Sequence, residues 1–321
     1  MRDSFIARLE KLAAHNPRIF LITGDLGFGV LDAFEKRFPK QFLNAGVAEQ
    51  NMTGVATGIA MEGRIVFTYS IGNFPTLRCL EQIRNDAAYH NADLKVIAIG
   101  GGFSYGALGM SHHATEDLAI LRALSIPVVA PGCDWEAAEA VDALVETPGT
   151  CYLRLDRASA GSTAMPGERF HIGKSRRLRE GEDVTLIAAG GILGATLAVA
   201  DHLASEKGVN ARVLSMHTVN PLDVTAVVAA ARETGGIVTV EEHTVMGGLG
   251  GAVAEACLDN GVAPRAFARV ALRNGFSSVV GSQEYLRARY GMDPAAIEAA
   301  AESVAKGVSP VEKGGLLTAN L

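Results

Sequence analysis

Residues 42–63 read FLNAGVAEQNMTGVATGIAMEG and join the end of one predicted strand to a complete predicted helix. The strand candidate is the short run 40–43, and residues 48–61 form an Ala- and Gly-rich segment of helical length. A single carboxylate, Glu49, stands at the start of this apolar helix. The order of strand and then helix recurs along the chain, and this repetition decides the predicted fold.

Two series of alternating strands and helices follow this pattern. The strand candidates are short, rich in Ile and Val, and bounded by Gly, Pro or polar residues. They occupy residues 18–23, 64–68, 94–99, 126–130 and 150–153, and then 184–188, 211–215, 237–240 and 266–270. The helical patterns cover residues 3–14, 48–61, 74–90 and 134–146, and then 193–205, 224–232 and 252–260. The alternation predicts an α/β protein with two open parallel-sheet domains, in which helices cover both faces of each sheet.

Chain length and composition set the domain count and exclude several classes of protein. With 321 residues the chain is too long for one compact core. We divide it into a first domain at 1–157, a linker at 158–183, a second domain at 184–308 and a tail at 309–321. Hydrophobic residues make up 48% and charged residues 20%, as in soluble globular proteins. The 4 cysteines are isolated, which argues against zinc ribbons and disulfide frameworks.

Charge and hydropathy exclude two kinds of partner. The formal net charge is -6, and the densest basic stretch is only KSRR at 174–177 with Arg179 nearby. We therefore expect no nucleic-acid partner, because phosphate binding needs a clustered basic face. There is no run of 18 or more apolar residues, so no membrane partner is expected. The N-terminal MRDSF carries an acid and no apolar signal core, so we expect a cytoplasmic location.

The loops that follow the strands of the first series are the expected ligand sites, because open parallel sheets bind ligands at the carboxyl ends of their strands. This rule selects residues 24–29, 44–49, 69–74 and 100–113. Glu49, in the second of these loops, has two interpretations. An acid in the first turn of a helix interacts favourably with the helix dipole, an effect worth ~0.3–1 kcal/mol. Alternatively, a partly buried carboxyl that keeps its proton would share it with a ligand nitrogen.

Several motifs, in order, resemble the thiamine-diphosphate enzymes of the transketolase family. The opening segment 42–63 is similar to the family's glutamate-bearing helix, and FTYSIGNF at 67–74 to its strand and loop that end in a stacking aromatic. ALGMSHHATEDLAILRALSIPVVAP at 107–131 is similar to the segment with an active-site histidine. YLRLDR at 152–157 resembles the strand that supplies a phosphate-binding arginine, and VTVEEHTVMGGLGGAVAEA at 238–256 resembles the C-terminal domain. The resemblance therefore covers essentially the whole chain.

The resemblance implies a pyrimidine-binding domain followed by a transketolase C-terminal domain, and it assigns the cofactor site. Glu49 would hydrogen-bond the aminopyrimidine ring of thiamine diphosphate, and Phe74 would stack on that ring. Asp25 and Leu26, in the first loop, complete the predicted cofactor-binding residues. Thiamine diphosphate supplies carbanion chemistry that amino-acid side chains lack. A protonated Glu49 would support this chemistry by acid–base catalysis through the ring nitrogen, and Phe74 would provide an aromatic face.

The resemblance also implies substrate-binding residues, each of which has a structural alternative. His112 would be the catalytic donor to a substrate carbonyl or hydroxyl, or it would only belong to the polar entry of the following helix. Arg157 would bind a substrate phosphate with its rigid fork of donors, and Arg2 would be a second phosphate contact. Alternatively, Arg157 would pair with Asp156, an interaction worth only ~0–1 kcal/mol when exposed.

Two departures from the family pattern affect the expected function. The chain lacks the Gly-Asp-Gly…Asn pattern that holds magnesium and the cofactor's diphosphate in the family. We therefore expect no metal ligand on this chain and place the Mg2+ ligands on a partner. The chain thus resembles one subunit of a split transketolase that pairs with an N-terminal subunit, with two copies of each. In addition, Leu108 replaces an acid and Gly100 a common histidine, which predicts a branched or otherwise modified sugar.

The resemblance implies a transferase subunit that, with its partner, moves a two-carbon ketol unit from a ketose phosphate to an aldose phosphate. The nearest alternative is the beta subunit of a 2-oxo acid dehydrogenase, which has a similar length and domain order. A synthase that joins pyruvate to a triose phosphate and a non-catalytic partner of the same fold are further alternatives. The segments AGVAEQN and SHHATEDLAIL, together with Arg157, favour the sugar enzyme.

Overall fold

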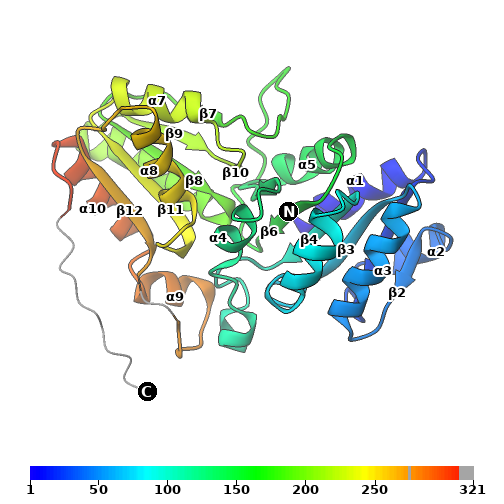
Figure 1. The fold of residues 1–321 in the computed structure, drawn as a ribbon. Coiled ribbons are helices and arrows are strands. Elements are labelled where there is room, and N and C mark those ends of the chain that lie inside the picture. Colours follow the sequence, from blue (N-terminus) through cyan, green and yellow to red (C-terminus); the bar gives the residue numbers. More distant parts are fainter. Residues whose placement is uncertain (274–275, 311–321) are drawn as a thin grey trace.

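The computed structural model describes residues 1–273 and 276–310, which form two α/β domains that lie side by side (Figure 1). The first domain is built on a 7-stranded sheet in the order β10-β5-β6-β4-β3-β1-β2. Its strands are β1 (Ile19–Thr23), β2 (Phe42–Asn44), β3 (Ile65–Ile71), β4 (Leu94–Ile99), β5 (Val128–Val129), β6 (Cys151–Leu155) and β10 (Thr218–Asn220). The second domain has a 5-stranded sheet in the order β12-β11-β8-β9-β7. Its strands are β7 (Arg176–Arg179), β8 (Val184–Ala189), β9 (Ala211–Ser215), β11 (Ile237–Thr244) and β12 (Phe267–Leu272).

Helices cover both faces of the first sheet, as the alternation predicts. The helices are α1 (Arg2–Ala13), α2 (Asp32–Arg37), α3 (Glu49–Met61), α4 (Asp117–Arg122) and α5 (Asp134–Glu146). Shorter 3-10 and π turns are η1 (Leu77–Cys79), η2 (Gln82–Ala88), η3 (Gly106–Leu108) and η4 (Met110–His112). α1 and α5 pack on one face, and α3 and η2 pack on the other. Strand β3 serves both faces because its side chains alternate, so that Phe67 lies under α1 and Val66 under α3.

The second sheet is covered in the same way. Its helices are α6 (Leu193–His202), α7 (Val224–Glu233), α8 (Leu249–Asp259), α9 (Gln283–Arg289) and α10 (Pro294–Ala305), with short turns η5 (Gly190–Ile192) and η6 (Leu203–Lys207). α6 and α10 pack on one face. α7 and α8 pack on the other face, in a hydrophobic cluster that continues into the first domain through Leu118 and Leu121 of α4. The two domains therefore share part of one core.

Each sheet is parallel except for one antiparallel edge strand, so both sheets are mixed. β10 lies between β9 and α7 in the chain, yet it pairs with β5 at the edge of the first sheet. β7 pairs antiparallel with β9 and falls inside the segment predicted as a linker, residues 158–183. Its sequence, RRLR, contains one apolar residue and so gives no strand pattern. Arg176 is nonetheless buried, because Glu136 and Glu168 pair with its guanidinium.

Other differences from the predicted elements are local. The predicted helix at 74–90 is replaced by a turn around Phe74, followed by η1 and η2. Helices α9 and α10 have no counterpart in the sequence analysis. Apart from Ser309 and Pro310, the predicted tail lies outside the described residues. None of the helices within the described residues combines the length and hydropathy that a membrane crossing requires.

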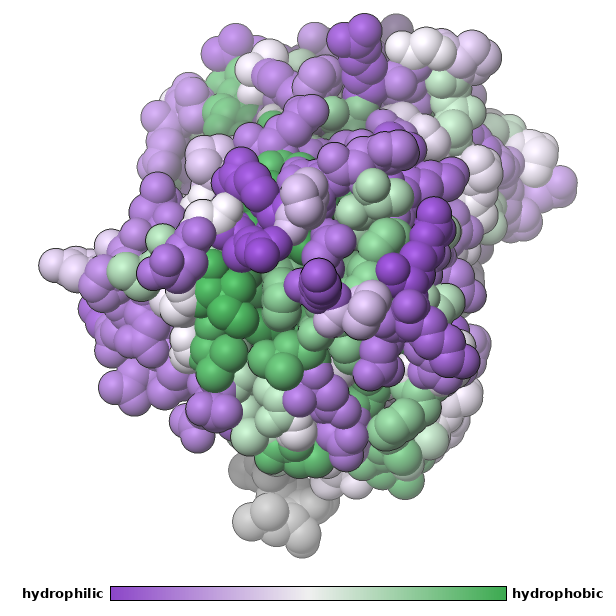
Figure 2. Space-filling model, turned by 90° about the vertical axis from the view of Figure 1, so that its right-hand side faces the viewer, coloured by the Kyte–Doolittle hydropathy of each residue, from purple (hydrophilic) through white to green (hydrophobic). Residues whose placement is uncertain are grey.

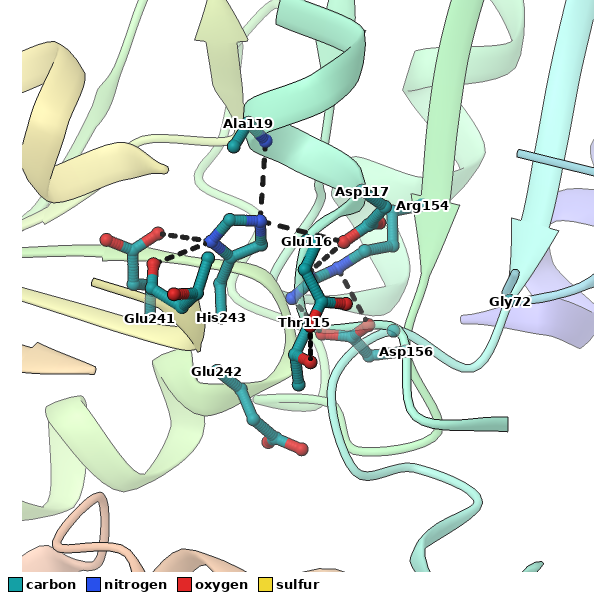
Figure 3. A network of polar contacts seen from close by, with 12 residues as sticks. Gly72, Thr115, Glu116, Asp117, Ala119, Arg154, Asp156, Glu241, Glu242 and His243 are labelled. Atoms are coloured by element: carbon teal, nitrogen blue, oxygen red, sulfur yellow. Dashed lines mark hydrogen bonds and ion pairs between the residues drawn. The ribbon is translucent and has the colours of Figure 1, made fainter. Parts of the chain in front are cut away.

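A buried polar network joins the two domains (Figure 3). The Arg154 guanidinium, fully buried in β6, lies 3.3 Å from an oxygen of Asp117 and 3.2 Å from one of Asp156. Asp117 also lies 3.9 Å from Nε2 of His243 in the second domain. Asp156 accepts a hydrogen bond from the backbone N–H of Gly191, across the same boundary, at 2.7 Å. Burial opposes the charged form of Arg154, but the two carboxylates hold its pKa above the ordinary value.

Removal of the Arg154 charge is expected to destabilise the protein strongly. Arg154→Met leaves two buried carboxylates without a cation, and breaking a buried pair costs about 3–5 kcal/mol in the free energy of unfolding. The matched control is Arg8→Met, which breaks a partly exposed pair with Asp142 and is expected to cost at most about 1 kcal/mol. Urea unfolding followed by circular dichroism measures both values, and equal effects would contradict a special role for the buried network.

Candidate active site

The parallel strands of the first sheet bring several predicted site residues to one edge. Glu49 begins α3, directly after β2, and its side chain is only 3% exposed. The Arg78 guanidinium donates to Oε2 of Glu49 over 2.7 Å. Gly24, which follows β1, lies beside this carboxyl, since a Cβ at Gly24 would lie 3.6 Å from Cγ of Glu49. A buried carboxylate with a single cation partner thus forms one end of the site.

Phe74 forms the next part of the site. The Arg78 guanidinium carbon lies 4.7 Å from the centre of the Phe74 ring, so one planar cation contacts both Phe74 and Glu49. The Phe74 ring also contacts His112, whose ring centre lies 5.1 Å away in an edge-on arrangement. Glu49, Phe74 and His112 therefore lie in one continuous row, although they come from three separate segments of the chain.

His112 lies in η4 and is partly exposed. Its Nδ1 is 3.0 Å from the hydroxyl of Ser111, which leaves Nε2 for another partner. Partial burial, and secondarily the neighbouring His113, lowers the pKa of His112 below the ordinary value. The lowered pKa favours the neutral imidazole, in which one ring nitrogen donates and the other accepts a hydrogen bond.

Asp25 and Leu26 lie in the loop next to Glu49. Asp25 has a left-handed backbone with φ of 58°, and its side chain is exposed. The Asn44 amide donates to the Asp25 carboxylate over 3.1 Å, which links this loop to the end of β2. The backbone oxygen of Leu26 accepts from the hydroxyl of Thr23. Their location is compatible with the predicted site, and their contact with a cofactor stays a prediction.

The two predicted phosphate ligands meet at a separate pocket of about 420 Å³. Arg2 and Arg157 both line this pocket, together with Tyr105 and Asp3. Arg157 is exposed, and no ion pair joins its side chain to Asp156 within the described residues, because Asp156 pairs with Arg154 instead. Arg2 donates to Asp3 over 2.9 Å. Both guanidinium groups can therefore contribute positive charge to a bound anion.

Tyr105 links the arginine pocket to the rest of the site. Its ring centre lies 6.4 Å from that of His112, and the Arg157 guanidinium carbon lies 5.8 Å from the Tyr105 ring. The site consequently extends from Glu49 past Phe74 and His112 to the two arginines. Sequence reasoning missed both Tyr105 and Arg78. Arg78 lies four residues after Phe74, a spacing that brings side chains together in a helical turn, and Tyr105 lies in a loop that the sheet-edge rule selects.

The loop that carries Tyr105 and His112 is held from the second domain by Glu242. The buried Glu242 carboxylate accepts from the backbone N–H of Phe103 at 2.5 Å and from the Gln283 amide at 3.0 Å. Arg287 of α9 pairs with the same carboxylate at 2.5 Å. The second domain thus fixes the position of a loop that belongs to the first. Over residues 1–273 and 276–310, no three His, Cys, Asp or Glu side chains are grouped so as to hold a metal ion.

Comparison with known protein families assigns both domains of the chain to one family. Residues 1–162 match the family model of the transketolase pyrimidine-binding domain, and residues 173–297 match that of the transketolase C-terminal domain. The chain belongs to the transketolase family. The α/β fold with two domains in this order agrees with the sequence prediction and confirms it.

Several relatives of this transketolase-family chain are named as subunits of transketolases. It is 37% identical to an apulose-4-phosphate transketolase subunit of Phocaeicola vulgatus, over 91% of this chain and 93% of that protein. It is 34% identical to the 6-deoxy-6-sulfo-D-fructose transketolase subunit SqwH of a Clostridium species, over 95% of this chain and 94% of that protein. A solved structure described as a split gene transketolase, inactive beta4 tetramer, superposes with a TM-score of 0.84 at 33% identity, covering 95% of this chain and 97% of that one. The similarity to split transketolase subunits is therefore confirmed.

Proposed function

We propose that this chain is the catalytic C-terminal subunit of a two-chain transketolase that transfers a two-carbon ketol unit between sugar phosphates. One observation carries the proposal: at the carboxyl edge of the first sheet, Arg78 contacts both Glu49 and Phe74, and the Phe74 ring contacts His112. The family's cofactor, thiamine diphosphate, fits this row. Arg78 supports the fit, because its planar, nitrogen-rich guanidinium already lies between a buried carboxylate and an aromatic ring.

Thiamine diphosphate, when bound, supplies the carbanion chemistry that ketol transfer needs. The chain's own residues would hold a proton, bind the cofactor's ring and contact the substrate. Glu49, whose side chain is buried beside Gly24, would hold a proton against the ring nitrogen. Phe74 would provide the flat face for the ring. Arg78 must leave Glu49 when the ring binds, and the neutral His112 would donate to or accept from a substrate oxygen.

The arginine pocket supports an anionic sugar as substrate. Both relatives are named for sugars that carry an anionic group, a phosphate in one and a sulfo group in the other. Arg2 and Arg157 together would neutralise such a group with charge-assisted hydrogen bonds. Leu108, at 56% exposure, lines an adjoining pocket and offers no polar contact from its side chain, which favours a substrate that is modified or apolar at that point.

An exposed apolar face supports a partner subunit. Figure 2 views the end of the molecule formed by the first domain and shows apolar residues gathered among polar ones. Exposed apolar side chains of this domain include Phe28, Val47, which precedes α3, and Met61, the last residue of α3. Among the described residues, a Cβ at Gly54 or Gly58 would meet no atom within 4 Å beyond its chain neighbours and the nearby backbone of α3 itself. We propose that the N-terminal subunit, which would carry the Mg2+ and diphosphate ligands, packs here, with two copies of each chain in the complex.

Loss of Arg157 is expected to weaken use of phosphorylated sugars. Arg157→Met removes one charged donor, and hydrogen bonds to charged groups are worth about 1.5–3 kcal/mol, so kcat/KM should fall about 10- to 100-fold. Arg179→Met, which breaks an exposed pair with Asp201 in the second domain, is the control and should behave like the parent. Steady-state kinetics of the reconstituted complex measures both. Equal kcat/KM for the parent and Arg157→Met would remove Arg157 from the substrate site.

The proposed activity is tested with the partner subunit present. The reconstituted complex is incubated with a ketose phosphate and an aldose phosphate, and the products are identified by mass spectrometry. Two-carbon exchange between the sugars supports the proposal. Activity only with a 2-oxo acid and a lipoyl acceptor would assign the chain to the dehydrogenase alternative. Tight cofactor binding without either reaction would favour a non-catalytic partner.

A further inference from the structure

The Tyr105 ring packs in a space that only a glycine at position 100 leaves open. Its ring lies against Gly100, at the end of β4, where a Cβ would lie 2.2 Å from Cε2 of Tyr105. Gly100 also has a φ of 89°, a left-handed conformation that glycine adopts without strain. A side chain at position 100 and the Tyr105 ring are therefore mutually exclusive. Because Gly100 has no side chain, the ring of Tyr105, five residues further along the chain, can occupy the space beside it.

The Tyr105 ring lines two pockets that differ in their cationic groups. The pocket of about 420 Å³ contains two guanidinium groups, those of Arg2 and Arg157, beside the carboxylates of Asp3 and Asp156. The second pocket, of about 580 Å³, contains Arg157 alone as a cation, together with Leu108 and Glu284 at the start of α9. Tyr105 and Arg157 line both pockets. An anion could therefore accept hydrogen bonds from two guanidinium groups in the first pocket and from one in the second; of the carboxylates in the first pocket, Asp156 is already engaged by Arg154.

Tyr105 also orients the residue that the two pockets share. The Arg157 guanidinium carbon lies 5.8 Å from the Tyr105 ring, within the range of a cation–π interaction. The backbone N–H of Arg157 donates to the Ser104 hydroxyl at 3.3 Å, which ties the end of β6 to the residue before Tyr105. The described residues offer no hydrogen-bond partner to the Tyr105 hydroxyl. The ring, rather than the hydroxyl, therefore makes the contact that positions Arg157.

We propose that Tyr105 is a specificity-determining residue that directs the anionic end of the sugar into the Arg2–Arg157 pocket. The ring lines this pocket as well as the one that contains Leu108 and Glu284, and it holds Arg157 toward the anion. The inference rests on the proposed function, because it extends the substrate site of that reaction. The recognised group is a terminal tetrahedral oxyanion, either a phosphate or a sulfonate.

The first test uses this chain alone, because both arginines lie on it. Inorganic phosphate and methanesulfonate are titrated into the parent chain, Tyr105→Ala and Tyr105→Phe, with anion binding followed by NMR. Tyr105→Ala should weaken binding about threefold to tenfold, the range of a partly desolvated cation–π contact, and Tyr105→Phe should recover most of the loss. Preference for one probe tells a phosphate site from a sulfonate site. Tyr89→Ala, which removes an exposed tyrosine elsewhere, should bind as the parent does.

The second test measures specificity in the reconstituted complex. KM and kcat are determined for a ketose phosphate and for the same ketose without its phosphate. In Tyr105→Ala the KM of the phosphorylated sugar should rise about threefold to tenfold, while that of the unphosphorylated sugar stays the same or falls. Gly100→Ala should reproduce this change, because its Cβ displaces the ring.

Two outcomes would overturn the proposal. An unchanged ratio of the two KM values in Tyr105→Ala would show that the ring does not direct the anion. A loss in Tyr105→Phe as large as in Tyr105→Ala would assign the effect to the hydroxyl instead of the ring. If the parent complex transfers no ketol unit, the proposed function fails. Anion binding by the chain alone then still decides whether Tyr105 positions Arg157.

Discussion

Glu49→Gln is expected to slow hydrogen–deuterium exchange at the thiazolium carbon of the bound cofactor by at least about 100-fold, the lower end of typical general acid–base contributions. The amide of Gln would still donate a hydrogen bond to the ring nitrogen, so cofactor affinity should fall only modestly. It has no acidic proton to pass to the ring. The measurement is made in the complex with the partner subunit, by quenched-flow exchange and NMR.

Glu62→Gln is the matched control, since Glu62 lies at the other end of α3 and is exposed. It should exchange as fast as the parent. If Glu49 only stabilises the start of its helix, Glu49→Gln would instead cost up to about 1 kcal/mol of stability and leave the exchange rate alone. Exchange as fast in Glu49→Gln as in the parent would therefore remove Glu49 from the chemistry.

The purified chain is expected to transfer no ketol units until the N-terminal subunit is added, and addition should restore activity in full. The physical reason is that we expect the partner to supply the diphosphate and metal ligands, so that without it the cofactor would be held by its ring alone. Ketol transfer by the chain alone, at a rate that the partner does not alter, would contradict it.

A variant on α3 tests the same dependence through the interface. Gly58→Glu should leave the fold of the isolated chain intact, because among the described residues a Cβ there meets no atom within 4 Å beyond its neighbours in α3, yet it should block close packing by a partner. Complex formation, measured by analytical ultracentrifugation, should be lost together with activity. Thr225→Glu, on the exposed first turn of α7, is the control and should assemble normally. A Gly58→Glu complex with parental mass would place the interface elsewhere.

The sequence predicts elements well where burial alone determines them. β4 is buried along its whole length, and its predicted bounds, 94–99, are those observed. α5 is predicted equally well at 134–146, since an apolar face and acidic residues in its first turn mark its start. β7 has no such pattern, because its burial depends on ion pairs between Arg176 and residues far away in the chain.

The same distinction applies to the site. Glu49, Phe74 and His112 are predicted from motifs, because each lies in a segment that follows a strand and resembles a segment of the family. Arg78 and Tyr105 are not, because their importance comes from contacts with those residues across space: a guanidinium on Glu49, and a ring admitted by Gly100. Sequence patterns predict which loops lie at the ligand-binding edge of the sheet. They do not predict which side chains, distant in the sequence, pack together at that edge.

Strand β10 has a consequence for how this chain can be divided. Because residues of the second half complete the sheet of the first, a fragment that stops in the linker would expose the outer edge of β5. Unpaired N–H and C=O groups on such an edge favour self-association. An inserted protease site or a gene break between the two domains would therefore produce two interdependent fragments, not two independently stable proteins.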